Sequence, residues 1–484
     1  MRWSGALTPL SSAWSAGNVR LLSRSELLND SPLEAMSTRE IAKGIVRALR
    51  EAGYEAYLVG GCVRDRLLGF QPAEDDYDIA TNAPPQEVTR IFPHTKPVGA
   101  QFGVVLVVEG GRAFEVATYR RERGYSDGRH PDEVSFSELR EDALRRDFTI
   151  NALYEDPFMG EVLDPVGGRE DLKAGVVRAI GDPYARFRED KLRMLRAVRF
   201  AAWLGFSIEP RTWEALKALA PEVASVSPER ISDELRRLLT RKGRGQGVRL
   251  LHSSGLMAHI LPEVAAMAGV PQPPEFHPEG DVLEHTALTL EHLRGAWPPE
   301  DPPPDPSLEL ALGTLLHDVG KPPTFQRTDR IRFNRHEAVG TKMAESICRR
   351  LRTSNAVRER VVWLVKNHMV LKDIGNMRNS TKVRLFSHPG FPELLELHRA
   401  DALASHRRLE EYERALGEYR EFLSQPPPLK RLISGHDLIS MGLEPGPIFS
   451  EVLSMVEDAQ LDGRIRTKEE AMELVLSWMR GEDR

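Results

Sequence analysis

The segment LVGGCVRDRLLGFQPAEDDYDIAT, residues 58–81, decides what kind of domain the first part of this chain forms. Its glycine pair, Gly60 and Gly61, follows an apolar run and precedes a predicted helix, Val63 to Leu68, that carries Arg64. Glycines at a strand end let backbone N–H groups approach a phosphate, and the helix N-terminus that follows favours negative charge. Arginine adds a forked donor for phosphate oxygens. The segment therefore predicts a phosphate-binding turn.

Two aspartates close the same segment. Asp76 and Asp78 lie two residues apart on a predicted strand, so both carboxylates face one side while Tyr77 points away. One or two carboxylates together with substrate phosphates usually hold Mg2+, and a pair of Mg2+ ions stabilises both oxygens of an in-line displacement. A glycine pair or two spaced aspartates alone are more typical of a tight turn and a solvated acidic loop. Their occurrence in this order favours metal-dependent phosphate chemistry.

This segment resembles the first signature of the bacterial class II tRNA nucleotidyltransferases and poly(A) polymerases, members of the polymerase-beta-like nucleotidyltransferase superfamily. The resemblance implies that Asp76 and Asp78 are catalytic and hold two Mg2+ ions. It further implies that Gly61 and Arg64 bind the triphosphate of the incoming nucleotide.

A second block is RRDFTINA, residues 145–152. Two guanidinium forks beside a carboxylate, followed by small polar residues, can bind a sugar hydroxyl or a triphosphate, although such a run alone is more typical of a helix-end ion cluster. The resemblance assigns contacts with the nucleotide's ribose and phosphates to Arg146 and Asp147. A third metal carboxylate is either Asp147 or Glu115, on a predicted strand over residues 113–118.

The third block, EDKLRMLRAVRF over residues 189–200, is predicted as one helix in which Asp190 and Arg193 are surface neighbours. An exposed pair of this kind contributes only about 0.2–0.5 kcal/mol to helix stability. An Asp acceptor beside an Arg donor also matches the Watson–Crick edges of cytosine and adenine and opposes those of uracil and guanine, a discrimination of about 1–3 kcal/mol. The resemblance implies that this helix selects CTP and ATP through Asp190, Arg193, Arg196 and Arg199.

Histidines and aspartates recur through the later, helical part of the chain: His285, His317, Asp318, His336, His368 and Asp401. Imidazoles and carboxylates from separate helices can converge on a divalent transition metal that activates water. The adjacent His-Asp pair with its flanking residues resembles the HD phosphohydrolase superfamily. The resemblance implies a metal-competent site, with ligands His285, His317, Asp318 and Asp401, that hydrolyses phosphoesters such as 2′,3′-cyclic or terminal phosphates on damaged RNA ends.

The length of 484 residues predicts about three domains. The expected fold is an α/β polymerase-beta-like nucleotidyltransferase head followed by an all-α neck, an HD helical domain and a helical tail. We predict the head at residues 36–175, the neck at 176–245, the HD domain at 246–425 and the tail at 426–484. Residues 1–35 resemble a transit peptide weakly, and an overcalled start before Met36 is the favoured interpretation. Residues 120–134 are predicted to be a mobile loop.

Composition limits which cellular compartment and which kind of RNA-binding surface we expect. No apolar run approaches the roughly 18 residues that span a membrane, and Cys62 and Cys348 form no disulfide or metal pattern, so we expect a reducing, cytoplasmic environment. Because the net charge is −6, RNA binding must depend on a local patch. The candidate is the arginine-rich span 186–249, which includes Arg236, Arg237, Arg241, Lys242 and Arg244.

The sequence thus predicts template-independent addition of CCA to the 3′ end of tRNA from CTP and ATP, with a second, HD-type phosphohydrolase activity. The same head motifs would serve a poly(A) polymerase, or an enzyme that adds only CC or only A. A metal-dependent HD phosphohydrolase whose head only positions RNA is the alternative from another class. Paired metal carboxylates argue against it, because a binding module does not require them.

Overall fold

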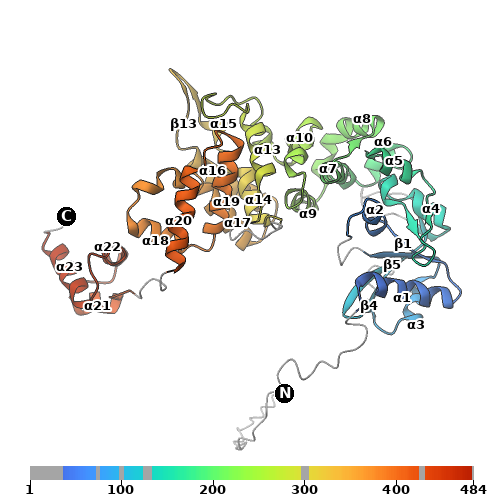
Figure 1. Ribbon diagram of the computed structural model, residues 1–484, viewed down its shortest axis with the longest axis horizontal. Coiled ribbons are helices and arrows are strands. Elements are labelled where there is room, and N and C mark those ends of the chain that lie inside the picture. Colours follow the sequence, from blue (N-terminus) through green and yellow to red (C-terminus); the bar gives the residue numbers. More distant parts are fainter. Residues whose placement is uncertain are drawn as a thin grey trace, which may run out of the picture. The chain divides into compact units, whose positions relative to one another are not determined.

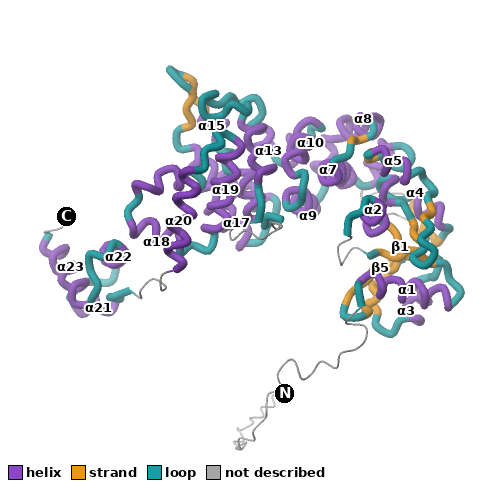
Figure 2. The backbone as a smooth tube through the Cα atoms, viewed as in Figure 1, coloured by secondary structure: helices purple, strands orange, loops and turns teal. Residues whose placement is uncertain are grey.

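The computed structural model describes residues 36–71, 77–96, 103–123, 133–295, 305–424 and 431–481. The predicted N-terminal extension and Asp76 lie outside these residues. The chain forms two compact units, of which the first runs to Tyr119 and takes in Tyr154–Val162, while Arg120–Leu153 and Leu163–Arg484 form the second. Strands gather around β1 and β5, whereas the chain from α5 onward is almost entirely helical (Figure 2). The division into head, neck, HD domain and tail stays a prediction.

The first unit is built on a mixed sheet, in which β1, β4 and β5 are labelled in Figure 1. Its strand order is β3-β4-β5-β2-β1-β8-β9. Strand β2 pairs in parallel with β5, and β1 pairs antiparallel with both β2 and β8. The elements are α1 (Thr38–Glu51), β1 (Ala56–Val59), α2 (Gly61–Leu67), β2 (Asp78–Thr81), α3 (Pro85–Ile91), β3 (Thr95–Lys96), β4 (Val104–Glu109), β5 (Arg112–Thr118), β8 (Tyr154–Glu155) and β9 (Val162–Leu163).

Helix α1 shows how the sequence specifies a helix that packs on this sheet. The Ser37 hydroxyl accepts from the Glu40 N–H and caps the helix, and Ile41, Ile45 and Leu49 recur at helical spacing and are buried. This apolar face packs on β1 beside α3.

The second unit begins with the antiparallel pair β6 (Arg120–Arg123) and β7 (Glu133–Phe136). Its next elements are α4 (Leu139–Leu144), η2 (Thr149–Asn151), α5 (Gly168–Ala174), β10 (Val176–Val177), α6 (Pro183–Glu189), α7 (Leu192–Leu204), β11 (Ser207–Ile208), α8 (Pro210–Leu219), η3 (Ala220–Ser225), α9 (Pro228–Leu239), α10 (Arg244–Ser253), α11 (Leu256–Ile260) and α12 (Pro262–Ala265).

The remaining elements are α13 (Val282–His292), α14 (Leu308–Leu316), α15 (Lys321–Thr324), β12 (Phe325–Arg327), β13 (Ile331–Phe333), α16 (His336–Arg350), α17 (Asn355–Asn367), η4 (Val370–Asn376), α18 (Asn379–Phe386), α19 (Phe391–Ala404), α20 (Glu410–Ser424), α21 (Gly435–Ser440), α22 (Pro447–Leu461) and α23 (Lys468–Arg480). The predicted fold class is confirmed, and two short strand pairs, β10-β11 and β12-β13, interrupt the part predicted as all-α. Among the described helices, none is both long and apolar enough to cross a membrane.

Two local predictions are wrong. Residues 189–200 do not form one helix: α6 ends at Glu189, α7 begins at Leu192, and Asp190 has an extended backbone with φ −144° and ψ 106°. The Asp190 carboxylate caps the new helix by accepting from the Leu192 N–H, which explains the break. The ends of the predicted loop 120–134 are paired strands rather than loop, and residues 124–132 lie outside the described part.

We predict that Gly243→Ala destabilises the second unit by about 3–5 kcal/mol. Gly243 has φ +83°, and a Cβ there would lie 2.0 Å from the Ala202 carbonyl oxygen, so α10 and α7 would have to separate. Urea unfolding of the variant measures the loss. Gly269→Ala is the matched control, because its φ of +73° carries the same strain with no atom within 4 Å, and about 1–2 kcal/mol is expected. Equal losses in the two variants would refute the crowding argument.

Candidate nucleotide and metal sites

In the first unit the predicted phosphate-binding turn and the aspartate strand meet at one end of two neighbouring interior strands, β1 and β2. Asp78 pairs with Val59, the residue directly before the glycine pair. Gly60 has φ 82°, a conformation that only glycine adopts without strain, and it leads into α2 at Gly61. The predicted turn and one predicted metal carboxylate therefore lie next to each other.

The register also bears on the third carboxylate. Ile79 pairs in parallel with Val116, so the preceding residues, Asp78 and Glu115, occupy adjacent positions on β2 and β5. Ile79 and Val116 are fully buried, which places Asp78 and Glu115 on the opposite face. Arg64, three residues after Gly61, is buried. Its guanidinium donates to the Asp65 carboxylate at 2.7–2.8 Å.

In the second unit, Asp147 has both carboxylate oxygens occupied. Oδ2 accepts from Arg196 Nε and Nη2 at 2.8 and 2.6 Å, and Oδ1 accepts from the Phe148 N–H and Asn151 Nδ2. Burial alone would raise the pKa of Asp147, but Arg196 and Asn151 hold it well below the usual value. The carboxylate is therefore ionised and firmly oriented, and it ties the RRDFTINA block to α7.

The charge network continues from Arg196 into α9. Arg196 Nη1 lies 3.8 Å from Glu234 Oε1, and the other Glu234 oxygen accepts from Arg199 Nε at 2.6 Å. Glu234 and Arg199 are each 5% exposed. Arg199, which the resemblance assigned to nucleotide binding, thus has its guanidinium buried against Glu234 in this structure.

Asp190 and Arg193 do not pair with each other. Asp190 Oδ2 accepts from Arg230 at 2.8 Å, and Arg193 donates to Glu189 at 2.6 Å and to the Arg145 carbonyl at 3.2 Å. Separate partners therefore hold each side chain in place. Arg146 and Arg145 share the buried carboxylate of Asp142 at 3.2 and 2.8 Å.

Sequence reasoning missed the acids and the arginine that orient these residues. Asp142 and Glu189 precede their arginine partners by three or four residues, a helical spacing that could have identified them. Glu234 and Arg230 come from α9, and no sequence spacing relates them to α7 or Asp190. The prediction for Arg244 in the basic patch is wrong, because Arg244 is 6% exposed and donates to the Leu290 and Leu293 carbonyls at the end of α13.

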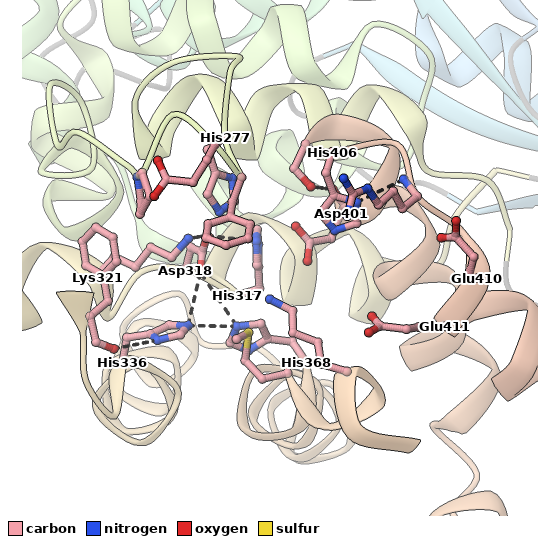
Figure 3. Close-up of a pocket in the computed structure, with 18 residues that line it drawn as sticks. His277, His317, Asp318, Lys321, His336, His368, Asp401, His406, Glu410 and Glu411 are labelled. Atoms are coloured by element: carbon pink, nitrogen blue, oxygen red, sulfur yellow. Dashed lines mark hydrogen bonds and ion pairs between the residues drawn. The ribbon is translucent and has the colours of Figure 1, made fainter. Parts of the chain in front are cut away.

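The second unit also contains a cavity of about 720 Å³, lined by His317, Asp318, His336, His368 and Asp401 (Figure 3). The predicted ligand His285 is fully buried and is not one of the lining residues, but it contacts Asp401. His285 comes from α13, His336 begins α16 and Asp401 comes from α19. His317 and Asp318 follow α14, and His368 follows α17. A Cβ on Gly320 would lie 2.1 Å from the His336 carbonyl oxygen, so glycine is required where the His317-Asp318 turn approaches α16.

Ligand atoms in this cavity converge in two groups that share Asp318. One group is His285, His317 and Asp318, the other is Asp318, His336 and His368, and within each group the ligand atoms lie within 4.8 Å of one another. Asp401 Oδ1 lies 2.9 Å from His285 Nε2 and so adjoins the first group. The cluster therefore contains all four predicted ligands together with His336 and His368.

The hydrogen bonding of the imidazoles suits metal ligands. Each histidine directs Nδ1 to an acceptor at 2.6–3.0 Å: Glu279 for His285, and the carbonyls of Thr314, Phe333 and Val365 for His317, His336 and His368. Each Nε2 is thereby left facing the cluster. The buried atoms His285 Nε2, His317 Nε2 and Asp318 Oδ2 make no hydrogen bond of good geometry among the described residues, although charged neighbours lie close to each: Asp401 at 2.9 Å, Asp318 at 3.2 Å and Lys321 at 2.6 Å, respectively. Buried ligand atoms that converge in this way fit a cation site.

Burial and neighbouring charges set the pKa values of the side chains in this cluster. Burial, together with the neighbouring His317, lowers the pKa of His368 to about 3, and burial also lowers that of His336, so both are neutral. Burial opposes protonation of His285, but contacts with Asp401 and Glu279 raise its pKa to about 9. Burial would raise the pKa of Asp318, whereas His317 and Lys321 hold it well below the usual value. This corner of the cavity therefore favours a cation.

Glu279 is a supporting residue that sequence reasoning missed. Its Oε1 lies 2.6 Å from His285 Nδ1 and 2.9 Å from His277 Nδ1, and it orients the His285 ring. Lys321, also missed, places Nζ 2.6 Å from both Asp318 Oδ2 and Gln272 Oε1. Lys321 lies three residues after Asp318, a spacing that could have identified it.

Three family models match the chain: the poly A polymerase head domain over residues 56–178, the probable RNA and SrmB-binding site of polymerase A over 205–267, and the HD domain over 282–425. A CCA-adding enzyme of Geobacillus stearothermophilus is 46% identical over 220 residues, or 45% of this chain and 54% of the relative. In such matches the chain spans about half the length of the relative.

Longer matches cover nearly the whole chain. A CCA-adding enzyme of Geobacillus sp. strain WCH70 is 33% identical over 433 residues, 89% of this chain and 94% of the relative. The crystal structure of the Bacillus stearothermophilus CCA-adding enzyme in complex with CTP matches with a TM-score of 0.69 and 30% identity, covering 92% of this chain and 100% of that one. On this evidence, the chain belongs to the family of CCA-adding enzymes.

Proposed function

We propose that this protein adds CCA to the 3′ end of tRNA without a nucleic-acid template, with CTP and ATP as substrates, and that it acts in the cytoplasm. Two observations together carry the proposal. The chain belongs to the family of CCA-adding enzymes, and separate partners hold the Asp190 and Arg193 side chains in place. The named relatives are CCA-adding enzymes, and one of them was crystallised with CTP.

The first unit supplies the residues for nucleotidyl transfer in this proposal. Asp78 and Glu115, on adjacent strands, would hold Mg2+ together with Asp76, which lies outside the described residues. Magnesium bound there would activate the RNA 3′-hydroxyl and neutralise charge on the triphosphate. Because hydrogen bonds occupy both oxygens of Asp147, we assign it a positioning role and propose Glu115 as the third carboxylate. Gly61, Arg64 and Arg146 would bind the triphosphate.

Base selection is proposed for Asp190 and Arg193. Arg230 and the Leu192 N–H hold the Asp190 carboxylate, whereas Glu189 and two backbone carbonyls hold the Arg193 guanidinium. Donors and acceptors that are fixed before binding discriminate better than mobile ones, because little ordering is required when the base arrives. Arg196 positions this pair through Asp147 and Glu234.

The experiment that tests this function is extension of a tRNA transcript that lacks its terminal CCA, with Mg2+ and CTP, ATP or both. Addition of two C followed by one A is expected. A product with only CC or only A would replace the proposal with a partial enzyme, and a long A tail would replace it with a poly(A) polymerase.

A second function, hydrolysis of phosphoesters, is proposed for the HD cavity. It rests on the buried imidazole and carboxylate atoms that converge around Asp318, and the two groups sharing Asp318 would hold two divalent transition-metal ions. Such ions supply an activated water and neutralise the phosphate. The water oxygen bonds to phosphorus, the ester P–O bond breaks, and the departing alcohol takes up a proton. Lys321 contributes a positive charge beside the cluster.

We predict that Asp78→Ala and Asp318→Asn separate the two activities. Asp78→Ala should lower nucleotide incorporation by roughly 100-fold to 1,000-fold or more, because a metal carboxylate is lost, and should leave phosphoester hydrolysis and nucleotide binding nearly intact. Asp318→Asn should abolish hydrolysis and leave incorporation unchanged. Incorporation kinetics measure the nucleotidyltransferase activity, and release of p-nitrophenol from p-nitrophenyl phosphate measures the hydrolysis. Retained incorporation by Asp78→Ala would refute the magnesium assignment.

Asp190→Ala should relax base choice. Loss of the acceptor is expected to raise incorporation of UTP relative to CTP by about 10-fold to 100-fold, which corresponds to the discrimination of one bidentate pair. Single-turnover incorporation of each nucleotide measures the ratio. Arg230→Gln should produce a smaller change in the same direction, because the carboxylate remains but loses its orienting partner. An unchanged ratio in Asp190→Ala would exclude a role in base choice.

Glu279→Gln should weaken binding of Mn2+ to the HD cavity by about 10-fold to 100-fold, since the residue that orients His285 and favours its Nδ1–H tautomer is altered. Titration calorimetry of metal-free protein measures the affinity. Glu275→Gln is the control, because Glu275 is exposed on the same loop and lines the same cavity. Equal affinities in the two variants would contradict the supporting role of Glu279.

A further inference from the structure

The connection between α15 and α16 is a short hairpin rich in arginine. Strands β12 and β13 pair from Phe325 with Phe333 to Arg327 with Ile331. The segment 325–335, here called the arginine hairpin, contains Arg327, Arg330, Arg332 and Arg335 and a single acid, Asp329. It begins one residue after α15, which carries Lys321, and it ends at His336 of the metal cluster. Its base is therefore part of the cavity wall.

The pairing register fixes which side chains face the cavity. Phe333 lines the cavity, and in an antiparallel pair the opposed residues share a face with those two positions away. Phe325, Arg327, Ile331 and Phe333 therefore lie on the cavity face of the hairpin, whereas Gln326 and Arg332 lie on the other face. Arg327 therefore shares the face of Phe333, and Arg330 lies in the turn that joins the two strands.

Most of this charge is not neutralised locally. Arg332 forms an ion pair with Asp329 at 2.9 Å, whereas Arg327, Arg330 and Arg335 have no acidic partner among the described residues and are exposed. The whole chain carries a net charge of −6, so a concentration of unpaired arginine beside a buried metal-ligand cluster is a local feature. It fits an anionic chain molecule that enters the cavity.

Aromatic rings lie at the same opening. Phe276 is 58% exposed and lines the cavity, as does Phe333, over whose ring Lys321 Nζ lies at 5.4 Å. The lining also holds the exposed cations Lys372 and Arg408 and the exposed acids Glu275, Glu410 and Glu411, so the excess of positive charge lies on the hairpin. A cationic surface combined with aromatic faces on which bases stack is the arrangement by which proteins bind single-stranded nucleic acid. An acidic peptide would use the arginines but would require neither exposed rings nor a metal cluster.

We propose that the arginine hairpin binds the backbone of a single-stranded RNA end and directs its terminal phosphate to the HD metal cluster. Arg327 and Arg330 contact backbone phosphates, and Phe276 stacks on a base near the terminus. This inference rests on the proposed phosphoester hydrolysis and adds to it the surface that binds the RNA.

The test compares two substrates in the full-length protein loaded with Mn2+: a short single-stranded oligoribonucleotide ending in a 2′,3′-cyclic phosphate, and p-nitrophenyl phosphate. Arg327→Gln combined with Arg330→Gln should lower kcat/KM for the RNA about 10-fold, mainly through KM, and leave p-nitrophenyl phosphate hydrolysis unchanged. The slope of log(kcat/KM) against log salt should become shallower by about 1.4, since each lost phosphate contact contributes about 0.7 for a single strand. Arg332→Gln, on the opposite face, should behave like the wild type.

An unchanged kcat/KM for RNA in the double variant, or an equal loss on both substrates, would overturn the inference. If the wild type hydrolyses neither substrate, the proposed hydrolysis itself is wrong, and binding is then measured separately. Photo-crosslinking of a 4-thiouridine oligoribonucleotide, mapped by mass spectrometry, should label peptides containing Phe276 or residues 325–335 and label them less in the double variant. Crosslinks confined to other parts of the chain would refute the binding role of the hairpin.

Discussion

The geometry of the proposed base-selecting region depends on one partly buried line of alternating charge. Asp147, Arg196, Glu234 and Arg199 connect the RRDFTINA block, α7 and α9 through contacts of 2.6–3.8 Å. At the buried pair Glu234–Arg199, removing one member costs about 3–5 kcal/mol, because the partner charge is left without compensation. The network therefore orients the three segments around Asp190 and Arg193, and it does so with arginines and acids that need not contact a substrate.

The HD cavity shows the opposite arrangement of buried charge. Along α7 the buried guanidinium of Arg199 forms a well-oriented hydrogen bond with Glu234, whereas in the cavity His285 Nε2, His317 Nε2 and Asp318 Oδ2 converge with charged neighbours but form no hydrogen bond of good geometry. Buried polar atoms without well-formed hydrogen bonds are costly and rare in native proteins. This difference separates a structural charge network from a ligand site, although histidine, arginine and aspartate supply both.

Two kinds of phosphate chemistry are thus proposed for one chain. The first unit and α7 would extend an RNA end, and the HD cavity would remove a phosphate from one. Both use carboxylates to hold metal ions, and they differ in ligand type: oxygen ligands in the head suit Mg2+, whereas imidazoles in the cavity suit a transition metal. A blocked 3′ end must be hydrolysed before it can be extended, so the two proposed reactions are chemically sequential.

The sequence by itself determined the fold class, the glycine turn after β1 and the strand positions of Asp78 and Glu115, and it identified histidines and aspartates that meet around Asp318, because glycine positions, apolar periodicity and adjacent functional residues are local signals. The break between α6 and α7 was not predicted, since the cap that Asp190 forms competes with an otherwise continuous helical pattern. Only the tertiary structure decided which charges are paired: Arg199 with Glu234, Asp190 with Arg230 and His285 with Glu279. Such pairs join residues from different elements, and their distances depend on how the helices pack rather than on spacing along the chain.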